Sequence, residues 1–86
     1  MPEPLTREEA LAQGFRPVAD AGELAARHEI TIEELIRRKN AYAADTQVQC
    51  DNDTVGQVCF DWTDDNNVRT ICYCTPAQTC DDCVQK

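Results

Sequence analysis

Two stretches in the second half of the chain alternate between hydrophobic and polar residues. They cover residues 57–63 and 68–74, and the turn-forming sequence Asp-Asp-Asn-Asn at 64–67 lies between them. Alternation places successive side chains on opposite faces of a strand, and Asp and Asn favour tight turns, so we predict a β-hairpin. A turn centred between the two strands sets Phe60 opposite Ile71 on one apolar face.

The same register sets Cys59 directly opposite Cys72 on the other face of the hairpin. Directly opposed residues in an antiparallel pair have Cα atoms about 4.5–5.5 Å apart, which a disulfide can bridge. Cys59–Cys72 is therefore the favoured disulfide. The apolar face is expected to receive the helices, and its members are Val58, Phe60, Ile71 and Tyr73.

The first half of the chain carries three helix-start signals. Each is a capping residue with a glutamate three positions later: Thr6 with Glu9, Asp20 with Glu23, and Thr31 with Glu34. Such pairs satisfy the free backbone N–H groups of a first helical turn. We predict three short helices over 7–13, 21–28 and 32–43, with Gly14 ending the first.

Composition changes sharply near residue 45. Residues 1–45 hold all seven glutamates and nine of the ten alanines, while residues 46–86 hold all six cysteines and six of the eight threonines. We predict a small α+β protein in which a helical segment, 1–45, precedes a cysteine-rich hairpin with an irregular tail, 46–86. A piece of about 40 residues rarely folds through its core alone, so the cysteines are expected to supply order.

The net charge of −8 disfavours a nucleic acid or an anionic membrane as partner. The charged N-terminal sequence has no apolar core of a secretory signal, and no stretch reaches transmembrane length. We expect synthesis in the cytoplasm without a Sec signal. The final compartment stays open, as does export of the C-terminal part after processing.

The cysteines allow three kinds of chemistry. Disulfides are favoured among Cys50, Cys59, Cys72, Cys74, Cys80 and Cys83, and their pairing is open beyond the hairpin pair. Zinc is the alternative cofactor, because Cys72, Cys74, Cys80 and Cys83 offer four thiolates in a short span. Enzymatic modification is the third. No other cofactor is predicted.

A helical, cysteine-free first part followed by a Cys- and Thr-rich second part resembles the leader–core layout of ribosomally made, post-translationally modified peptide precursors. The resemblance implies a non-enzymatic precursor whose leader, 1–45, is bound by modifying enzymes. It also implies that Thr54 and Thr75 are modified, since each precedes a cysteine at the span of a thioether ring. The expected recognition residues for this protein partner are apolar: Leu24, Ile30, Leu35 and Ile36.

Two alternatives of a different class stand beside the precursor. The first is a self-contained, disulfide-stabilised binding or inhibitory protein. The second is a small zinc-binding or helix-turn-helix regulator, because residues 24–35 resemble the helix-turn-helix pattern of DNA-binding proteins and also the helices of LysM modules. No catalytic residues are predicted: His28, the single histidine, is expected to be solvated at a helix end, and Trp62 to pack in the hairpin.

Overall fold

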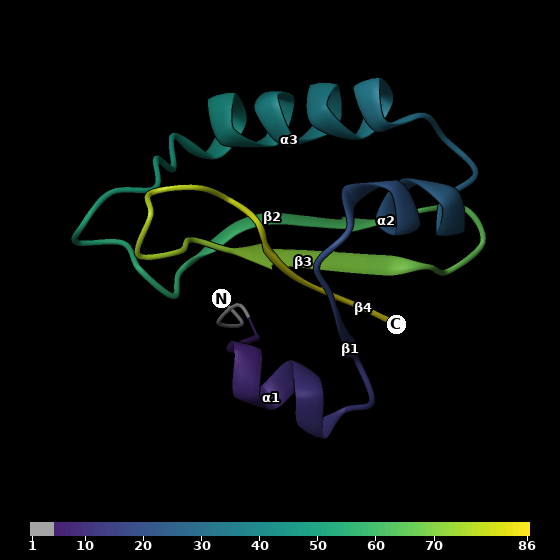
Figure 1. Ribbon diagram of the computed structural model, residues 1–86, viewed down its shortest axis with the longest axis horizontal. Coiled ribbons are helices and arrows are strands. Elements are labelled where there is room, and N and C mark those ends of the chain that lie inside the picture. The colour runs from purple at the N-terminus through teal and green to yellow at the C-terminus, as the bar shows by residue number, and fades with distance from the viewer. Residues whose placement is uncertain (1–4) are drawn as a thin grey trace.

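The computed structural model describes residues 5–86 and contains an antiparallel four-stranded sheet with helices on both faces (Figure 1). The predicted hairpin is present as β2 (Val58–Thr63) and β3 (Arg69–Tyr73). Two further short strands, β1 (Arg16–Val18) and β4 (Asp82–Gln85), complete the sheet in the order β1-β4-β3-β2. A small α+β fold is therefore confirmed.

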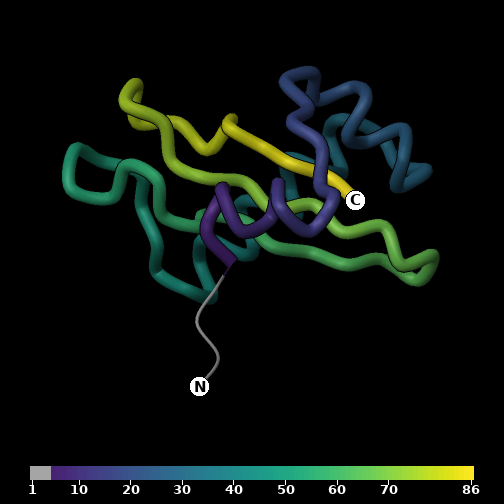
Figure 2. The backbone as a smooth tube through the Cα atoms, turned by 90° about the horizontal axis from the view of Figure 1, so that it is seen from below, coloured from purple at the N-terminus to yellow at the C-terminus, as the bar shows by residue number. Residues whose placement is uncertain are grey.

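The C-terminal tail is a central strand rather than an irregular segment, so that expectation was wrong. β4 pairs with β3 on one side and with β1 on the other, and Figure 2 shows it as the yellow strand beside the segment that carries β1. Cys83, Val84 and Gln85 are all buried. A short strand that is covered on both faces shows no alternation, so no pattern in the sequence marks it.

The helices lie where the capping signals place them. They are α1 (Arg7–Ala12), α2 (Ala21–Arg27) and α3 (Ile32–Thr46). Thr6 and Glu9 form the reciprocal capping box, and Thr31 accepts the Glu34 N–H at 3.1 Å. The third helix is not short, since it has 15 residues and crosses the predicted boundary at residue 45.

The hairpin register differs from the predicted one by a residue. Phe60 lies opposite Cys72 and Asp61 opposite Ile71, with an irregularity between Val58 and Phe60. The loop is longer than expected because the Asp64 carboxylate accepts the N–H groups of Asn66 and Val68, at 2.8 and 3.0 Å, and so holds five residues, 64–68, outside the strands.

This shift divides the core between the two faces of the sheet. Phe60 packs with Leu24 and Leu35 beneath α2 and α3, while Ile71 and Tyr73 pack with Val84, Ala10 and Phe15 over α1. The expectation of a single apolar face was therefore wrong. Residues from both predicted segments share this core and this sheet. Within residues 5–86, none of the helices is both long and apolar enough to cross a lipid bilayer.

Candidate functional site

All six cysteines are paired, but not as the hairpin register predicts. The disulfides are Cys50–Cys74, Cys59–Cys80 and Cys72–Cys83. The predicted Cys59–Cys72 pair is wrong because the irregularity at Cys59 moves Phe60, rather than Cys59, opposite Cys72. Cys72 instead lies opposite Cys83 of β4, a strand that the sequence did not reveal.

The four cysteines predicted as zinc ligands are therefore spread over three disulfides. Cys72 is bonded to Cys83, while Cys74 is bonded to Cys50 and Cys80 to Cys59. The sulfurs that do lie close together are those of Cys50, Cys59 and Cys74, which are all within 4.8 Å of one another. Cysteines that are close in sequence are therefore not the cysteines whose sulfurs lie close together in the fold.

Residues 51–57, which we name the tethered loop, lie between the first two cysteines and are fixed at both ends. Cys50 is bonded to Cys74, and the Gly56 N–H donates to the Cys74 carbonyl at 2.9 Å. Thr54 holds the interior: its hydroxyl donates to the Gln49 carbonyl at 2.9 Å and accepts the Asp51 N–H at 2.8 Å. The backbone of this loop is thus held without regular secondary structure.

Val55 is the apolar residue that the tethered loop presents to solvent. Its side chain is 47% exposed, one of three large exposed hydrophobic side chains among the described residues. Asp51 and Asp53, in the same loop, are also exposed. The sequence signal for this feature is a single aliphatic residue inside a run of turn formers.

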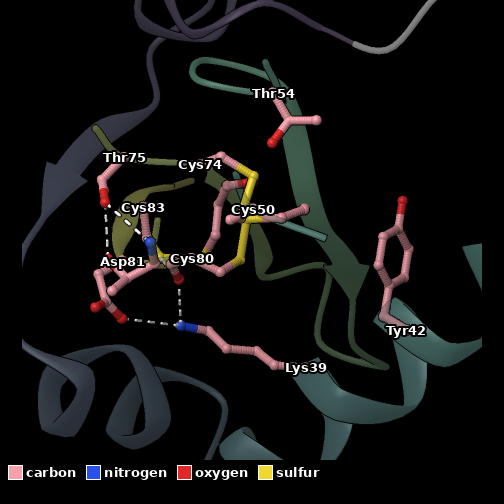
Figure 3. Close-up of a disulfide and its surroundings, with 12 residues drawn as sticks. Lys39, Tyr42, Cys50, Thr54, Cys74, Thr75, Cys80, Asp81 and Cys83 are labelled. Carbon is pink, nitrogen blue, oxygen red and sulfur yellow. Dashed lines mark hydrogen bonds and ion pairs between the residues drawn. A yellow bond between two sulfur atoms is a disulfide. The ribbon is translucent and has the colours of Figure 1, made fainter. Parts of the chain in front are cut away.

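The two threonines predicted as modification sites both hold turns. Thr54 organises the tethered loop, and Thr75 contacts the Thr79 hydroxyl at 2.8 Å and accepts the Thr79 N–H at 3.2 Å. Figure 3 shows Thr54 and Thr75 on either side of the Cys50–Cys74 disulfide. Modification of either hydroxyl stays a prediction, and in the folded chain it would remove these turn hydrogen bonds.

The predicted recognition residues do not form one surface. Leu24 and Leu35 are buried in the core, and Ile30 packs partly buried against it. Ile36 is the exposed member of the four, at 50%, on the side of α3 that lines a groove with Lys39 and Cys59. Helical periodicity predicts which apolar residues lie on the same face of a helix. It does not predict which of them pack against the chain's own sheet.

Lys39 extends from α3 toward the disulfides (Figure 3). Its ammonium group donates to the Cys80 carbonyl at 2.9 Å and lies 4.0 Å from the Asp81 carboxylate. Burial lowers the pKa of Lys39 below 10.5, although Asp81 opposes this shift. A partly buried cation therefore faces the loop that carries Cys80.

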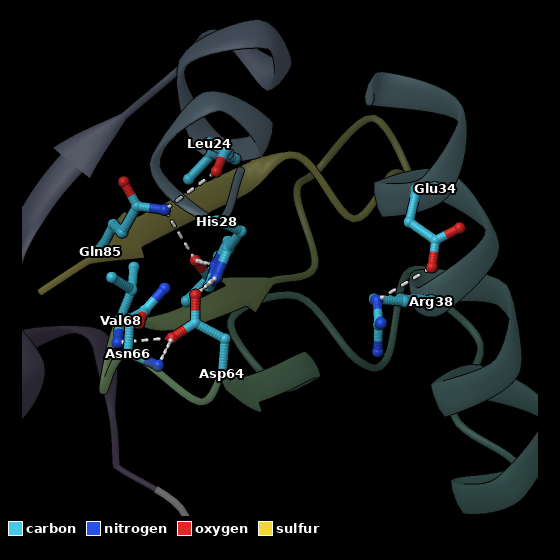
Figure 4. A network of polar contacts seen from close by, with 9 residues as sticks. Leu24, His28, Glu34, Arg38, Asp64, Asn66, Val68 and Gln85 are labelled. Carbon is cyan, nitrogen blue, oxygen red and sulfur yellow. Dashed lines mark hydrogen bonds and ion pairs between the residues drawn. The ribbon is translucent and has the colours of Figure 1, made fainter. Parts of the chain in front are cut away.

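His28 is buried, so the expectation of a solvated histidine was wrong. Its Nδ1 lies 2.8 Å from Asp64 Oδ2 and its Nε2 lies 2.6 Å from Thr70 Oγ1. Its ring stacks on Trp62 at 4.2 Å, and the Arg38 guanidinium lies 4.2 Å from the same indole ring. The ring thereby joins α2 to the hairpin, and Figure 4 shows His28 beside Asp64. Arg38 of α3 reaches the hairpin through Trp62. Because Asp64 lies 36 positions from His28, no local pattern predicts their contact.

The polar order in this cluster is carboxylate, imidazole and hydroxyl, as in the triad of serine hydrolases. An ionised Asp64 only accepts hydrogen bonds, so Nδ1–H donates to it, and in the neutral imidazole Nε2 then accepts the Thr70 hydroxyl proton. Gln85 donates to the same Thr70 oxygen at 3.0 Å. Because Thr70 is completely buried, its hydroxyl has no path to a substrate, and the cluster acts as a polar support for packing.

The hydrogen bonds also set the charge state of Asp64. Burial on its own raises the pKa of this carboxyl group. The bonds from the His28 ring and from the N–H groups of Val68 and Asn66 outweigh burial, so the pKa lies below its usual value of 3.8. Asp64 is consequently an anion at neutral pH, and it holds both the hairpin loop and the imidazole.

Comparison with known protein families, curated proteins and solved structures gave no match.

Proposed function

We propose that this chain is a folded, non-enzymatic, disulfide-stabilised protein that binds another protein through the tethered loop. One observation carries the proposal: Val55 is 47% exposed on a loop that a disulfide and the Thr54 hydroxyl hold in place. Ordering a mobile loop opposes binding. A loop that is already ordered loses little conformational entropy on binding, so more of the free energy gained by burying its apolar side chain appears as affinity.

The packing of the two segments supports a self-contained protein over a leader with a detachable core. β1 belongs to the proposed leader, yet it pairs with β4 at the end of the proposed core. Leu24 and Leu35 are buried in one cluster with Phe60. A modifying enzyme that used these leucines would first have to pull the helices off the sheet.

The chemistry around Val55 defines the partner. The exposed carboxylates of Asp51 and Asp53 share its loop, and the only cations in residues 46–86 are Arg69 and Lys86. The matching surface is an apolar pocket with lysine or arginine at its rim, on another protein. Complementary charge of this kind speeds association and makes it sensitive to salt.

The shape of the loop argues for general protein binding rather than substrate-like protease inhibition. Residues 51–57 form successive turns and bends with no extended strand. Binding by strand addition requires an extended peptide backbone, which this loop does not offer. The contact is therefore made by side chains on a rigid turn, with Val55 at its centre.

The test compares two surface variants at residues of similar exposure that lie on different elements. Val55→Asp alters the tethered loop, and Ile36→Asp alters α3, where residue 36 is 50% exposed at the edge of a groove. Proteins captured by the wild-type chain from cells that make it are identified, purified and measured for affinity. Full burial of an exposed valine is worth about 1.5–3 kcal/mol, and about half of the Val55 surface is available to a partner, so we expect Val55→Asp to weaken binding by about 3- to 10-fold or more.

Ile36→Asp is expected to bind like the wild type. A partner lost through Ile36→Asp but not Val55→Asp would contradict the loop proposal and favour recognition of the helices, as in a precursor. Intact mass supplies the second readout for chain made beside its own neighbouring enzymes. Loss of water from the threonines, or thiols that stay blocked after reduction, would identify a precursor, whereas three reducible disulfides agree with the binding protein.

A further inference from the structure

Two of the disulfides lie against each other. The Sγ atoms of Cys50, Cys59 and Cys74 are all within 4.8 Å of one another, and Cys80 Sγ is bonded to Cys59 Sγ at 2.02 Å. We name these residues, Cys50, Cys59, Cys74 and Cys80, the four-sulfur cluster. The third disulfide, Cys72–Cys83, lies separately within the β3–β4 pair.

We propose that the four-sulfur cluster, when reduced, is a tetrahedral zinc site. Zn²⁺ with four thiolates has Zn–S bonds of about 2.3 Å, which places the sulfurs about 3.8 Å apart. The sulfurs within each disulfide must separate to that distance, while those of different disulfides start no more than 4.8 Å apart within the trio. Rotation about the cysteine side-chain bonds supplies movements of this size, because the backbone already brings the residues together.

Formation of the zinc site from the two disulfides takes place in two steps, reduction and metal binding. Two equivalents of a dithiol reductant give four electrons and four protons to the two disulfides and leave as two cyclic disulfides. The four resulting thiols then release four protons as Zn²⁺ binds, which leaves a zinc–tetrathiolate with a charge of −2. The same chain would thus be cross-linked by sulfur in an oxidising medium and by zinc in a reducing one.

The surroundings of the cluster favour an anionic metal centre. A groove of about 340 Å³ runs beside α3, and its lining includes Cys50, Cys59, Cys80 and Lys39, so an ion has a path inward. The Lys39 ammonium group donates to the Cys80 carbonyl at 2.9 Å. Its positive charge offsets part of the negative charge of the thiolates, which is the usual work of residues just outside a metal's ligands.

This set differs from the one that sequence spacing favours. Cys74 and Cys80 belong to both sets, but spacing adds Cys72 and Cys83, whereas the fold adds Cys50 and Cys59. The difference gives a matched pair of single variants. Cys59→Ala removes a ligand from the four-sulfur cluster alone, and Cys83→Ala removes a ligand from the alternative set alone.

The experiment uses the full chain, reduced without oxygen by a phosphine, which competes weakly for metal. Native mass spectrometry after addition of Zn²⁺ should show one zinc bound with loss of four protons. Co²⁺ replaces zinc as the optical probe, because its sulfur charge-transfer absorbance grows with the number of thiolates. Cys59→Ala should lower this absorbance by about a quarter, as one ligand of four is lost, and Cys83→Ala should leave it unchanged.

Three results would overturn the proposal. The reduced wild type could bind no metal, Cys83→Ala could lower the absorbance while Cys59→Ala does not, or both variants could lower it equally. The second result would assign zinc to the alternative set, and the third would indicate unspecific thiolate binding. Because the optical comparison uses single substitutions in already reduced protein, it does not depend on retaining any disulfide.

Discussion

Replacing Glu29 by glycine should stabilise the protein. Glu29 follows the last turn of α2 with φ of 59°, in the left-handed region that favours glycine. Its N–H donates to the Ala26 carbonyl and the Ile30 N–H donates to the Ala25 carbonyl, both at 3.0 Å. This is the Schellman pattern of helix ends. The end of α1 uses the same pattern with Gly14, at φ of 98°.

The magnitude follows from opposing backbone effects. The left-handed conformation costs a residue with a side chain about 1–2 kcal/mol, and glycine escapes that cost. Glycine also makes the unfolded chain more flexible, which lowers the free energy of unfolding by about 0.4–1 kcal/mol. The Glu29 side chain is exposed, so little packing is lost. We expect a net gain of about 0.5–1 kcal/mol, or a rise in Tm of about 2–8 °C for a domain of this size.

Thermal and urea unfolding, followed by circular dichroism with the disulfides intact, would measure this gain. Glu29→Ala is the control, because it removes the charge near the helix C-terminus but keeps a side chain in the left-handed region. Gly14→Ala is the reciprocal variant and should lose about 1 kcal/mol, although nothing lies within 4 Å of the added methyl group. The reasoning fails if Glu29→Gly is no more stable than Glu29→Ala.

Three further predictions concern packing and pH. Leu35→Ala should destabilise the protein by about 2–5 kcal/mol in urea unfolding, whereas its exposed neighbour Ile36→Ala should change stability by less than about 0.5 kcal/mol. The pKa of Asp64 is lowered in the folded state, so this carboxylate stabilises the fold above pH 3.8, and that stabilisation is lost as the pH falls below 3.8. Asp64→Asn should therefore weaken the dependence of Tm on pH in acid. Burial raises the pKa of Tyr73 above 10.0, so the neutral phenol stabilises the fold below pH 10.0, and that stabilisation is lost as the pH rises further. Tyr73→Phe should therefore make the free energy of unfolding depend less on pH in alkaline solution.

The elements that the sequence predicted correctly depend on local signals. Capping residues lie within three positions of the groups that they satisfy, so Thr6 and Thr31 marked the starts of α1 and α3. Alternation marked β2 and β3. Local patterns failed for β1 and β4, which have three and four residues and are defined only by the strands beside them.

The disulfide pairing depended on a single misplaced residue. The Asp64 carboxylate enlarges the hairpin loop, and the extra residue is compensated by the irregularity beside Cys59. An error of one position exchanges the two faces of a strand. That error paired Cys59 with Cys72, when Cys59 in fact bonds to Cys80, beyond the hairpin. The partner of Cys59 lies outside residues 57–74, so the alternation within these residues does not identify it.

The buried helices also explain where a partner can bind. α2 and α3 pack on one face of the sheet and α1 packs on the other (Figure 1), so both faces carry helices of the chain itself. Loops and the outer faces of helices remain. Among the described residues, the tethered loop places the exposed Val55 on a loop that the Cys50–Cys74 disulfide anchors, and that disulfide belongs to the four-sulfur cluster. Any change in the redox or metal state of the cluster would therefore alter the anchor of the loop, and the affinity of Val55 for its partner should change with it.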